Sequence, residues 1–364
     1  MKISRSAAFA LYVSAAASLS AGCSGTSQPS PLGPTFITNE TRNVAGTLPM
    51  RGGFGAFDSV RPYGVPHPDR RKSWVSPDAK GDPRLLFASD SGLEDVNIYS
   101  LPSMKLKGQL TGFSVPQGMC ADSAGNVYVA DTNATQVVEY SHAGSLVARY
   151  ADNYGFPIGC AVDPATGNLA VTDLVNDGSG PGEVQIFSSP SAQPRILVNP
   201  SVFYYYFAGY GPDGSLWVSG TDANGVYMLS RCGASSCSTI SLSGGTLYFP
   251  GAVQWDKVQN TWVVFDQLCG NTPSACSYPV SPSGALGKAT TYSNYKGGND
   301  CDLIQGEIAN NGHHDYVVGG DYEYCGAATS TFDRWTYAAG GTPTNRTLLP
   351  DVNSVPNGVA ISIK

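Results

Sequence analysis

The stretch that decides the fold lies at residues 116–131, which read PQGMCAD, SAGN and VYVAD. Forty-one residues further on, residues 157–173 repeat this pattern as PIGCAVD, PATGN and LAVTD. In both copies a Gly-Asn turn leads into a short apolar run that ends in Asp. Self-similarity at such a period is typical of repeat architectures, so we expect one structural unit per repeat.

Weaker copies of the pattern follow at 209–219, 250–266 and 304–321. Each copy continues with a third and a fourth β-rich run, as QVVEY at 136–140 and SLVAR at 145–149 do in the first. Runs with apolar residues at helical spacing are almost absent. Four strands per unit, at a period of roughly 40–55 residues, predict the blades of a β-propeller.

The pattern P-x-G-x-A-x-D, then G-N, then an apolar strand ending in Asp resembles the NHL repeat, within the larger group of six-bladed propellers that includes sugar-lactone hydrolases. The resemblance is specific at 114–152 and 153–200 and degenerate elsewhere. It implies an all-β fold of four-stranded antiparallel blades over 85–364. Residues 85–90 resemble a second strand without a first, and 356–363 a first strand without a successor. We therefore predict six blades, closed by pairing of the C-terminal strand into the first blade, which removes exposed sheet edges.

The N-terminal region is predicted to be an export signal over residues 1–23. Lys2 and Arg5 precede an apolar run that is too short to span a bilayer. The run ends in LSAGC, which resembles the lipobox of bacterial lipoproteins and would make Cys23 the lipidated residue. Ser20 stands where that motif usually has leucine, and an ordinary secretory signal cleaved nearby is the alternative. Both readings place the protein in the bacterial cell envelope, either anchored to a membrane or in the periplasmic or extracellular space.

Charge divides the chain into a basic and an acidic part. Residues 1–84 hold ten Lys and Arg against five Asp and Glu, whereas residues 85–364 hold eleven against twenty-three. Residues 24–84 are also rich in Pro, Gly and Ser, and we expect a flexible, irregular basic linker there. Such a linker suits anionic lipid headgroups. The alternative for residues 36–84 is that Phe54, Phe57, Tyr63 and Trp74 pack against the outside of the globular domain. The acidic body argues against a nucleic-acid partner, which requires a basic surface.

Nine cysteines are present, and assigning Cys23 to a lipid leaves eight for disulfides in an oxidising compartment. The strand positions favour four pairs: Cys232–Cys237 across a tight turn, Cys269–Cys276 within a loop, Cys301–Cys325 in the last full blade, and Cys120–Cys160 between neighbouring innermost strands. The last pair depends on whether two blades approach within disulfide reach.

The alternating strand directions define two faces of the predicted propeller. The tight-turn face carries the short turns at 123–125, 142–144, 164–167 and 212–214. The loop-rich face carries the loops at 174–183, 267–277 and 322–330, and long loops on a rigid scaffold are common sites of function. We therefore expect a binding surface on the loop-rich face, around the channel mouth, formed by aromatic residues: Tyr204, Tyr205, Tyr206, Phe249, Tyr295, Tyr322 and Tyr324. The alternative is that these rings are wedges between blades.

The Asp that closes each second strand invites a metal-binding interpretation, but a structural one is favoured. Asp readily caps turns by accepting backbone N–H groups, and one copy per blade is what such a role produces. Asp302, Glu307 and Asn357 remain weak candidates for a divalent cation, calcium or similar, at the channel mouth. The loop that begins at Asp173 has oxygen ligands but not the spacing of an EF-hand.

The sequence lacks the catalytic and metal-binding residues that propeller enzymes of this kind use. Sugar-lactone hydrolases of this architecture hold a channel metal with an early Glu, which has no counterpart in the first blade, and propeller lyases use channel histidines, whereas the four histidines here lie in the linker or in turns. No G-x-S-x-G elbow is present. The leading hypothesis is a non-catalytic binding or scaffold module for a protein or glycan partner. The alternative is a metal-dependent lactonase-like or lyase-like enzyme with a degenerate site.

Overall fold

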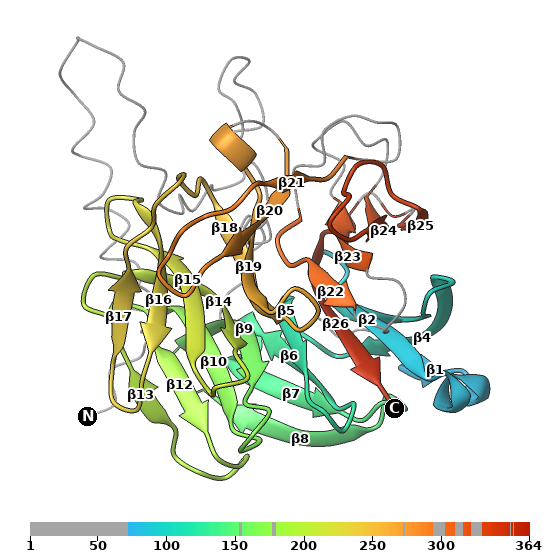
Figure 1. Ribbon diagram of the computed structural model, residues 1–364. Coiled ribbons are helices and arrows are strands. Elements are labelled where there is room, and N and C mark those ends of the chain that lie inside the picture. Colours follow the sequence, from blue (N-terminus) through green and yellow to red (C-terminus); the bar gives the residue numbers. More distant parts are fainter. Residues whose placement is uncertain are drawn as a thin grey trace, which may run out of the picture. The chain divides into compact units, whose positions relative to one another are not determined.

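A computed structural model describes the chain over residues 72–152, 155–176, 180–271, 274–293, 303–309, 316–321, 330–349, 351 and 353–364. Across these residues the strands form six antiparallel sheets, each containing one four-stranded blade (Figure 1). The predicted all-β, six-bladed propeller is confirmed. None of the helices in the described part of the chain has the length and apolarity to cross a membrane.

From the innermost strand outward, each blade follows the chain order, except that blade 1 begins with the last strand. Blades 1 and 2 consist of β26 (Pro356–Ile363), β2 (Arg84–Asp90), β3 (Asp95–Ser100) and β4 (Lys105–Thr111), and of β5 (Pro116–Ala121), β6 (Val127–Asp131), β7 (Gln136–Tyr140) and β8 (Leu146–Ala151). Blades 3 and 4 consist of β9 (Gly155–Val162), β10 (Leu169–Asn176), β12 (Val184–Phe187) and β13 (Arg195–Leu197), and of β14 (Tyr204–Tyr210), β15 (Leu216–Thr221), β16 (Tyr227–Cys232) and β17 (Cys237–Ile240). Blades 5 and 6 consist of β18 (Pro250–Asp256), β19 (Thr261–Asp266), β20 (Cys276–Val280) and β21 (Thr290–Thr291), and of β22 (Glu307–Ala309), β23 (Tyr316–Asp321), β24 (Thr331–Thr336) and β25 (Asn345–Leu348).

The ring is closed by the C-terminal strand, as predicted. β26 pairs antiparallel with β2, with Leu86 opposite Ile361 and Ala88 opposite Val359 (Figure 1). These side chains are buried in one apolar cluster with Phe332 of blade 6. Because the cluster joins the two ends of the repeat array, closure is stabilised by apolar burial as well as by the strand ladder.

The folded domain begins before residue 85. Strand β1 (Trp74–Val75) pairs with β4 at the outer edge of blade 1, and a 3₁₀ helix, η4 (Pro77–Gly81), follows it. Ala79 of this helix is fully buried in the core shared by blades 1 and 2. Residues 74–84, which the composition assigns to the linker, therefore form ordered structure at the edge of the propeller.

The glycine of the P-x-G pattern lets neighbouring innermost strands approach each other. A Cβ atom at Gly118 would overlap the carbonyl oxygen of Ile158 in the next blade, and one at Gly358 would overlap the carbonyl oxygen of Gln117. Glycine is used where two backbones must come this close. The repeat motif is therefore explained by packing around the ring.

Hydroxyl side chains connect consecutive blades. Ser89, Thr172 and Ser219 each lie near the end of a second strand, and each donates a hydrogen bond to a carbonyl on the innermost strand of the next blade. In blade 2 the corresponding position is Ala130, and Thr132 bonds to the Pro157 carbonyl instead. These buried bonds fix each blade against its neighbour.

Candidate ligand-binding cleft

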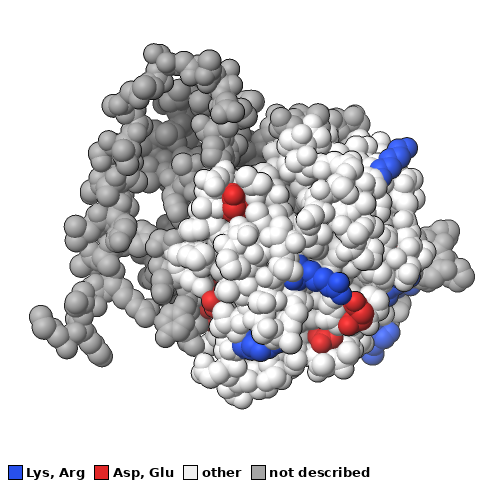
Figure 2. Space-filling model, turned by 60° about the vertical axis from the view of Figure 1, so that its left-hand side comes forward, with Lys and Arg blue, Asp and Glu red and all other residues white. Residues whose placement is uncertain are grey.

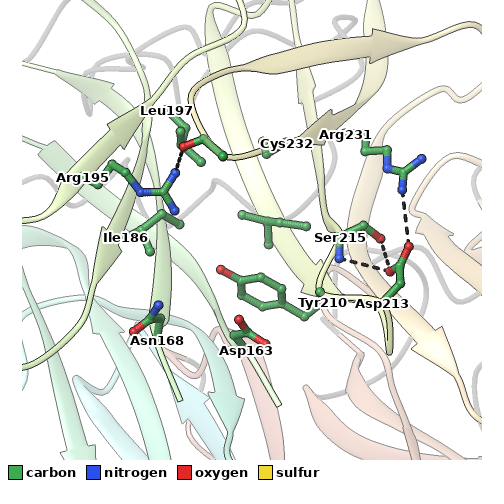
Figure 3. A pocket seen from close by; sticks show the side chains of 14 residues that line it. Asp163, Asn168, Ile186, Arg195, Leu197, Tyr210, Asp213, Ser215, Arg231 and Cys232 are labelled. Carbon is green, nitrogen blue, oxygen red and sulfur yellow. Dashed lines mark hydrogen bonds and ion pairs between the residues drawn. The ribbon is translucent and has the colours of Figure 1, made fainter. Parts of the chain in front are cut away.

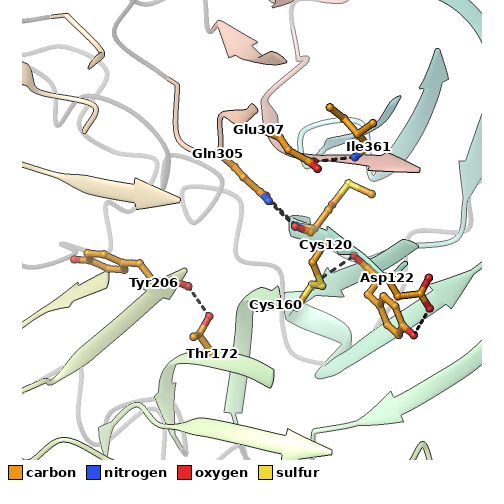
Figure 4. The surroundings of a disulfide bond; sticks show 10 residues. Cys120, Asp122, Cys160, Thr172, Tyr206, Gln305, Glu307 and Ile361 are labelled. Atoms are coloured by element: carbon orange, nitrogen blue, oxygen red, sulfur yellow. Dashed lines mark hydrogen bonds between the residues drawn. A yellow bond between two sulfur atoms is a disulfide. The ribbon is translucent and has the colours of Figure 1, made fainter. Parts of the chain in front are cut away.

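A glutamine side chain joins two non-adjacent blades inside the ring. Gln305, just before β22 of blade 6, reaches past blade 1 to Met119 on β5 of blade 2 (Figure 4). Its Oε1 accepts the Met119 N–H at 2.9 Å and its amide nitrogen donates to the Met119 carbonyl. Beside it, Ile304 joins Ile158, Tyr206 and other buried apolar residues from blades 3 to 5 in one cluster. Side chains thus fill this part of the ring interior.

The weak metal candidates are not brought together. Glu307 Oε2 accepts the Ile361 N–H at 2.8 Å, whereas Asn357 donates to Ser91 Oγ at 2.5 Å. Asn357 and Ile361, the residue that Glu307 contacts, are four residues apart on β26, or about 13 Å along the strand. A Ca²⁺ ion needs its ligands at about 2.3–2.6 Å. Burial raises the pKa of Glu307 to about 8, which opposes the charged form that a cation would need. Asp302 lies outside the described residues.

Across the parts of the chain that the structure describes, no group of three or more His, Cys, Asp and Glu side chains is arranged to hold a metal ion. Three of the aspartates that close the second strands, Asp90, Asp131 and Asp266, act as predicted, as acceptors for backbone N–H groups. Asp90 Oδ1 accepts from Gly92, Leu93 and Val355, and so ties the strand end to the segment that leads into β26. Asp266 accepts from Tyr248, Phe249 and Leu268.

The loop that lacks the spacing of an EF-hand begins at a buried carboxyl pair, Asp152 and Asp173. The amide of Gln185 donates to Asp152 at 2.8 Å and to Asp173 at 2.9 Å. Burial, with the Asp152 charge beside it, raises the pKa of Asp173 well above its ordinary value. The following loop residues 177–179 lie outside the described residues.

Most of the described aromatic residues predicted for the loop-rich face are buried. Tyr205 is 1 % exposed, Tyr206 3 % and Phe249 9 %, and only Tyr204 is half-buried. The Tyr205 hydroxyl accepts the N–H of Asn199 at 2.6 Å. These three rings therefore pack between blades, as in the alternative reading. Three further residues of the predicted surface lie outside the described residues: Tyr295, Tyr322 and Tyr324.

Three of the predicted disulfides are present: Cys120–Cys160, Cys232–Cys237 and Cys269–Cys276. The innermost strands of blades 2 and 3 do come within disulfide reach, with the Cα atoms of Cys120 and Cys160 5.6 Å apart (Figure 4). The fourth predicted pair, Cys301–Cys325, falls outside the described residues.

A cavity of about 550 Å³ opens on the tight-turn face between blades 3 and 4. Arg195 and Arg231 lie on opposite sides of it, with Tyr210 and Asp163 between them (Figure 3). Arg195 donates to the Ala234 carbonyl. Burial, with the Asp163 charge nearby, raises the pKa of Tyr210 to about 12, so its hydroxyl keeps its proton at neutral pH.

A second cavity, of about 240 Å³, continues the first between blades 4 and 5. The two cavities share Asp213, Ser215 and Arg231, and we call them together the inter-blade cleft. Its second part is lined by tryptophans 217, 255 and 262. The rings of Trp217 and Trp262 are stacked with centroids 4.5 Å apart, and the Trp255 ring meets Trp262 edge-on at 5.5 Å.

Part of the sequence is similar to known proteins. The family model for the NHL repeat matches residues 113–140. The human NHL-repeat-containing protein 4 is 34 % identical over 105 residues, which cover 28 % of this chain and 80 % of that protein. The chain belongs to the NHL-repeat family. The mouse protein of the same name is 32 % identical over 104 residues, covering 28 % of this chain and 73 % of its own length.

Solved structures resemble the whole NHL propeller in fold alone. One is a chain from a nidogen/laminin complex, with a TM-score of 0.55 and 13 % identity over 77 % of this chain and 98 % of that one. Another is a protein of unknown function from Bacteroides caccae, with a TM-score of 0.58 and 12 % identity over 78 % of this chain and 100 % of that one.

The tryptophan cluster of this NHL propeller was missed in the sequence. Trp217 and Trp262 occupy the second residue of the second strand in blades 4 and 5, so a repeated tryptophan was the available signal. The repeated tryptophan alone did not indicate a cluster at a cavity, because the third ring, Trp255, comes from a different strand, β18. The proposed surface on the loop-rich face stays a prediction, because much of it lies outside the described residues.

Proposed function

We propose that the protein is an exported, membrane-anchored NHL propeller that serves as a non-catalytic binding module for a protein or glycan partner. The observation that carries this proposal is the contrast between the ring interior and the inter-blade cleft. Gln305 joins blades 6 and 2 inside the ring, where a channel enzyme would need space, whereas the cleft is open to solvent and lined by aromatic and hydrogen-bonding groups. Ligand sites in proteins combine these two kinds of lining.

Export is supported by the cysteines. The three disulfides of the described residues are consistent with an oxidising compartment outside the cytoplasm. Anchoring is supported by the Cys23 context, together with the basic composition of the linker that follows it. A single acyl group binds membranes only marginally, so a basic linker would add to the attraction.

The anchor is tested by metabolic labelling of cells with an alkyne-bearing fatty acid, followed by fractionation. We expect label and membrane association in the wild-type protein and loss of both in Cys23→Ala. Cys23→Ser, which keeps the size of the side chain, is the matched control and should behave like the alanine variant. Label that survives both substitutions would overturn the lipid anchor and leave the soluble secreted form.

The competing enzyme hypothesis is tested by the metal content of the purified protein. A binding module should carry no divalent metal at one equivalent per chain after dialysis, whether or not Asn357 is replaced by alanine. Stoichiometric metal that is lost in Asn357→Ala, with the fold retained by circular dichroism, would favour the lactonase-like alternative. Gln305→Ala should leave the metal content unchanged.

A further inference from the structure

We infer that the inter-blade cleft binds an uncharged pyranose glycan of two or three sugar rings, with Trp255 as the surface on which one ring stacks. This inference rests on the proposed binding function and gives it a ligand class and a site. It moves the expected binding surface from the loop-rich face to the tight-turn face, at blades 3 to 5.

The aromatic part of the cleft has the geometry of a stacking platform. Trp217 and Trp262 are 1 % and 3 % exposed and stack on each other, so their rings are held in place from below. Trp255 stands edge-on to Trp262 and is only half-buried. An indole fixed in this way offers a flat apolar face beside polar groups, which suits the C–H face of a sugar ring at low cost in side-chain entropy.

The polar lining favours hydroxyl groups over a charged ligand. Two guanidinium groups, of Arg195 and Arg231, face two carboxyl groups, of Asp163 and Asp213, so neither sign is in excess. On the side of the molecule that carries β13 and β17, charged side chains are few and both signs are scattered among uncharged residues (Figure 2). A sugar hydroxyl both donates and accepts, and therefore satisfies carboxylates and guanidinium groups together.

The polar groups at the junction of the two cavities are available to a ligand. Arg231 contacts Asp213 at 3.3 Å, but the two side chains are 51 % and 60 % exposed. A surface pair of this kind contributes little to stability, so it can exchange its contact for ligand hydroxyls. Because Asp213, Ser215 and Arg231 line both parts of the cleft, a glycan that occupies both parts would contact these residues.

A buried donor in the cleft lining points to a missing acceptor. Trp217 lines the second cavity, and its Nε1–H is buried without a hydrogen-bond partner among the described residues. A buried donor without an acceptor is unfavourable. A hydroxyl of a bound sugar, or a water that it holds, would supply the acceptor.

An extended peptide fits this cleft less well. A peptide that binds by strand addition needs an exposed sheet edge, where main-chain hydrogen bonds supply the affinity. The cleft walls are instead made by turns and side chains, such as the β14–β15 turn around Asp213. We therefore commit to a glycan and treat peptide binding as an outcome of the test.

The test is a titration of the purified protein with neutral β-linked trisaccharides of glucose, N-acetylglucosamine, mannose, galactose and xylose, followed by calorimetry and tryptophan fluorescence. Three of the five tryptophans lie in the cleft, so binding should change the emission. We expect Trp255→Ala to weaken binding at least tenfold and Trp255→Phe to weaken it less. Trp74→Ala is the matched control, because Trp74 is 46 % exposed on β1 and should not affect binding.

The possible results separate the site from the function. Binding that is equal in Trp255→Ala and Trp74→Ala would overturn the cleft as the site but leave a glycan-binding module. Preference for a trigalacturonate, the anionic comparison sugar, would overturn the uncharged ligand class. Failure of the whole neutral panel would overturn the glycan inference alone, and a tight complex with a peptide or protein would then still support the binding function. Loss of folding in Trp255→Ala is checked by its thermal transition, and Trp255→Phe then carries the test.

Discussion

Replacement of Asp131 by asparagine should make the propeller more stable at slightly alkaline pH. Asp131 closes β6 and is fully buried, where its carboxyl group accepts hydrogen bonds from the Ser114 N–H at 2.6 Å and from the Gln136 amide at 3.1 Å. Burial raises the pKa of Asp131 from 3.8 to about 7, against the opposite effect of these hydrogen bonds. Asparagine keeps an oxygen acceptor for Ser114 but cannot ionise.

The sign and size follow from proton linkage. Because the folded-state pKa is raised, the contribution of Asp131 is fully present below pH 3.8 and is lost as the pH rises through about 7. At 1.36 kcal/mol for each unit between the two values, the loss by pH 8 is about 4 kcal/mol. The variant escapes this loss, so we expect it to exceed the wild type at pH 8 by about 2–4 kcal/mol and by far less at pH 5.

The assay is urea unfolding of both proteins at pH 5, 6, 7 and 8, with disulfides intact. The difference in free energy of unfolding between variant and wild type isolates Asp131 from other buried acids such as Asp333. Asp213→Asn is the control, because hydrogen bonds from Ser215 lower the pKa of this exposed carboxyl and its replacement should bring no gain at pH 8. A difference that stays constant from pH 5 to 8 would refute the linkage argument.

Three further predictions concern the closed ring. Ser219→Ala should lower the free energy of unfolding by about 1 kcal/mol, measured in urea, because it removes the hydrogen bond to the Gly251 carbonyl; Ser219→Thr, which keeps the hydroxyl, should retain more of it. Removing the Cys120–Cys160 disulfide by alanine substitution of both cysteines should cost about 2–4 kcal/mol by the same method, and an unchanged unfolding midpoint would show that it does not constrain the chain. Deleting residues 356–364 should expose the edge of β2 and cause aggregation in light scattering; a monomeric, cooperatively folded product would contradict closure by β26.

Ring closure and blade number were accessible from the sequence because they depend on local pattern. The segments that begin at Pro116 and Pro157 share the same pattern of strands and turns, so the strand positions can be read from each segment separately. The unmatched strands at the two chain ends then fix the count, since an open ring would leave β2 unpaired. The pattern also placed Cys120 and Cys160 in adjacent registers of neighbouring inner strands, but it left open whether the two strands approach within disulfide reach, which the structure shows.

The site was less accessible because it depends on distances across the ring. Nothing adjacent in sequence shows that Gln305 bonds to Met119, a residue 186 positions away. The expectation of exposed aromatics at Tyr205 and Tyr206 failed because a strand at the propeller centre buries both of its faces. Conversely, the binding surface was expected on the loop-rich face, whereas turns of neighbouring blades leave a cleft near Asp213 on the tight-turn face.

Surface footprinting tests the central claim, that this propeller works as a binding module through its tight-turn face. Hydrogen–deuterium exchange would be compared between the purified protein and the protein bound to isolated cell envelopes. We expect protection at the turns 163–168, 211–215 and 256–261, which border the inter-blade cleft. Protection confined to the loop-rich face, at 267–277 and 322–330, or an exchange pattern unchanged by the envelope, would contradict it.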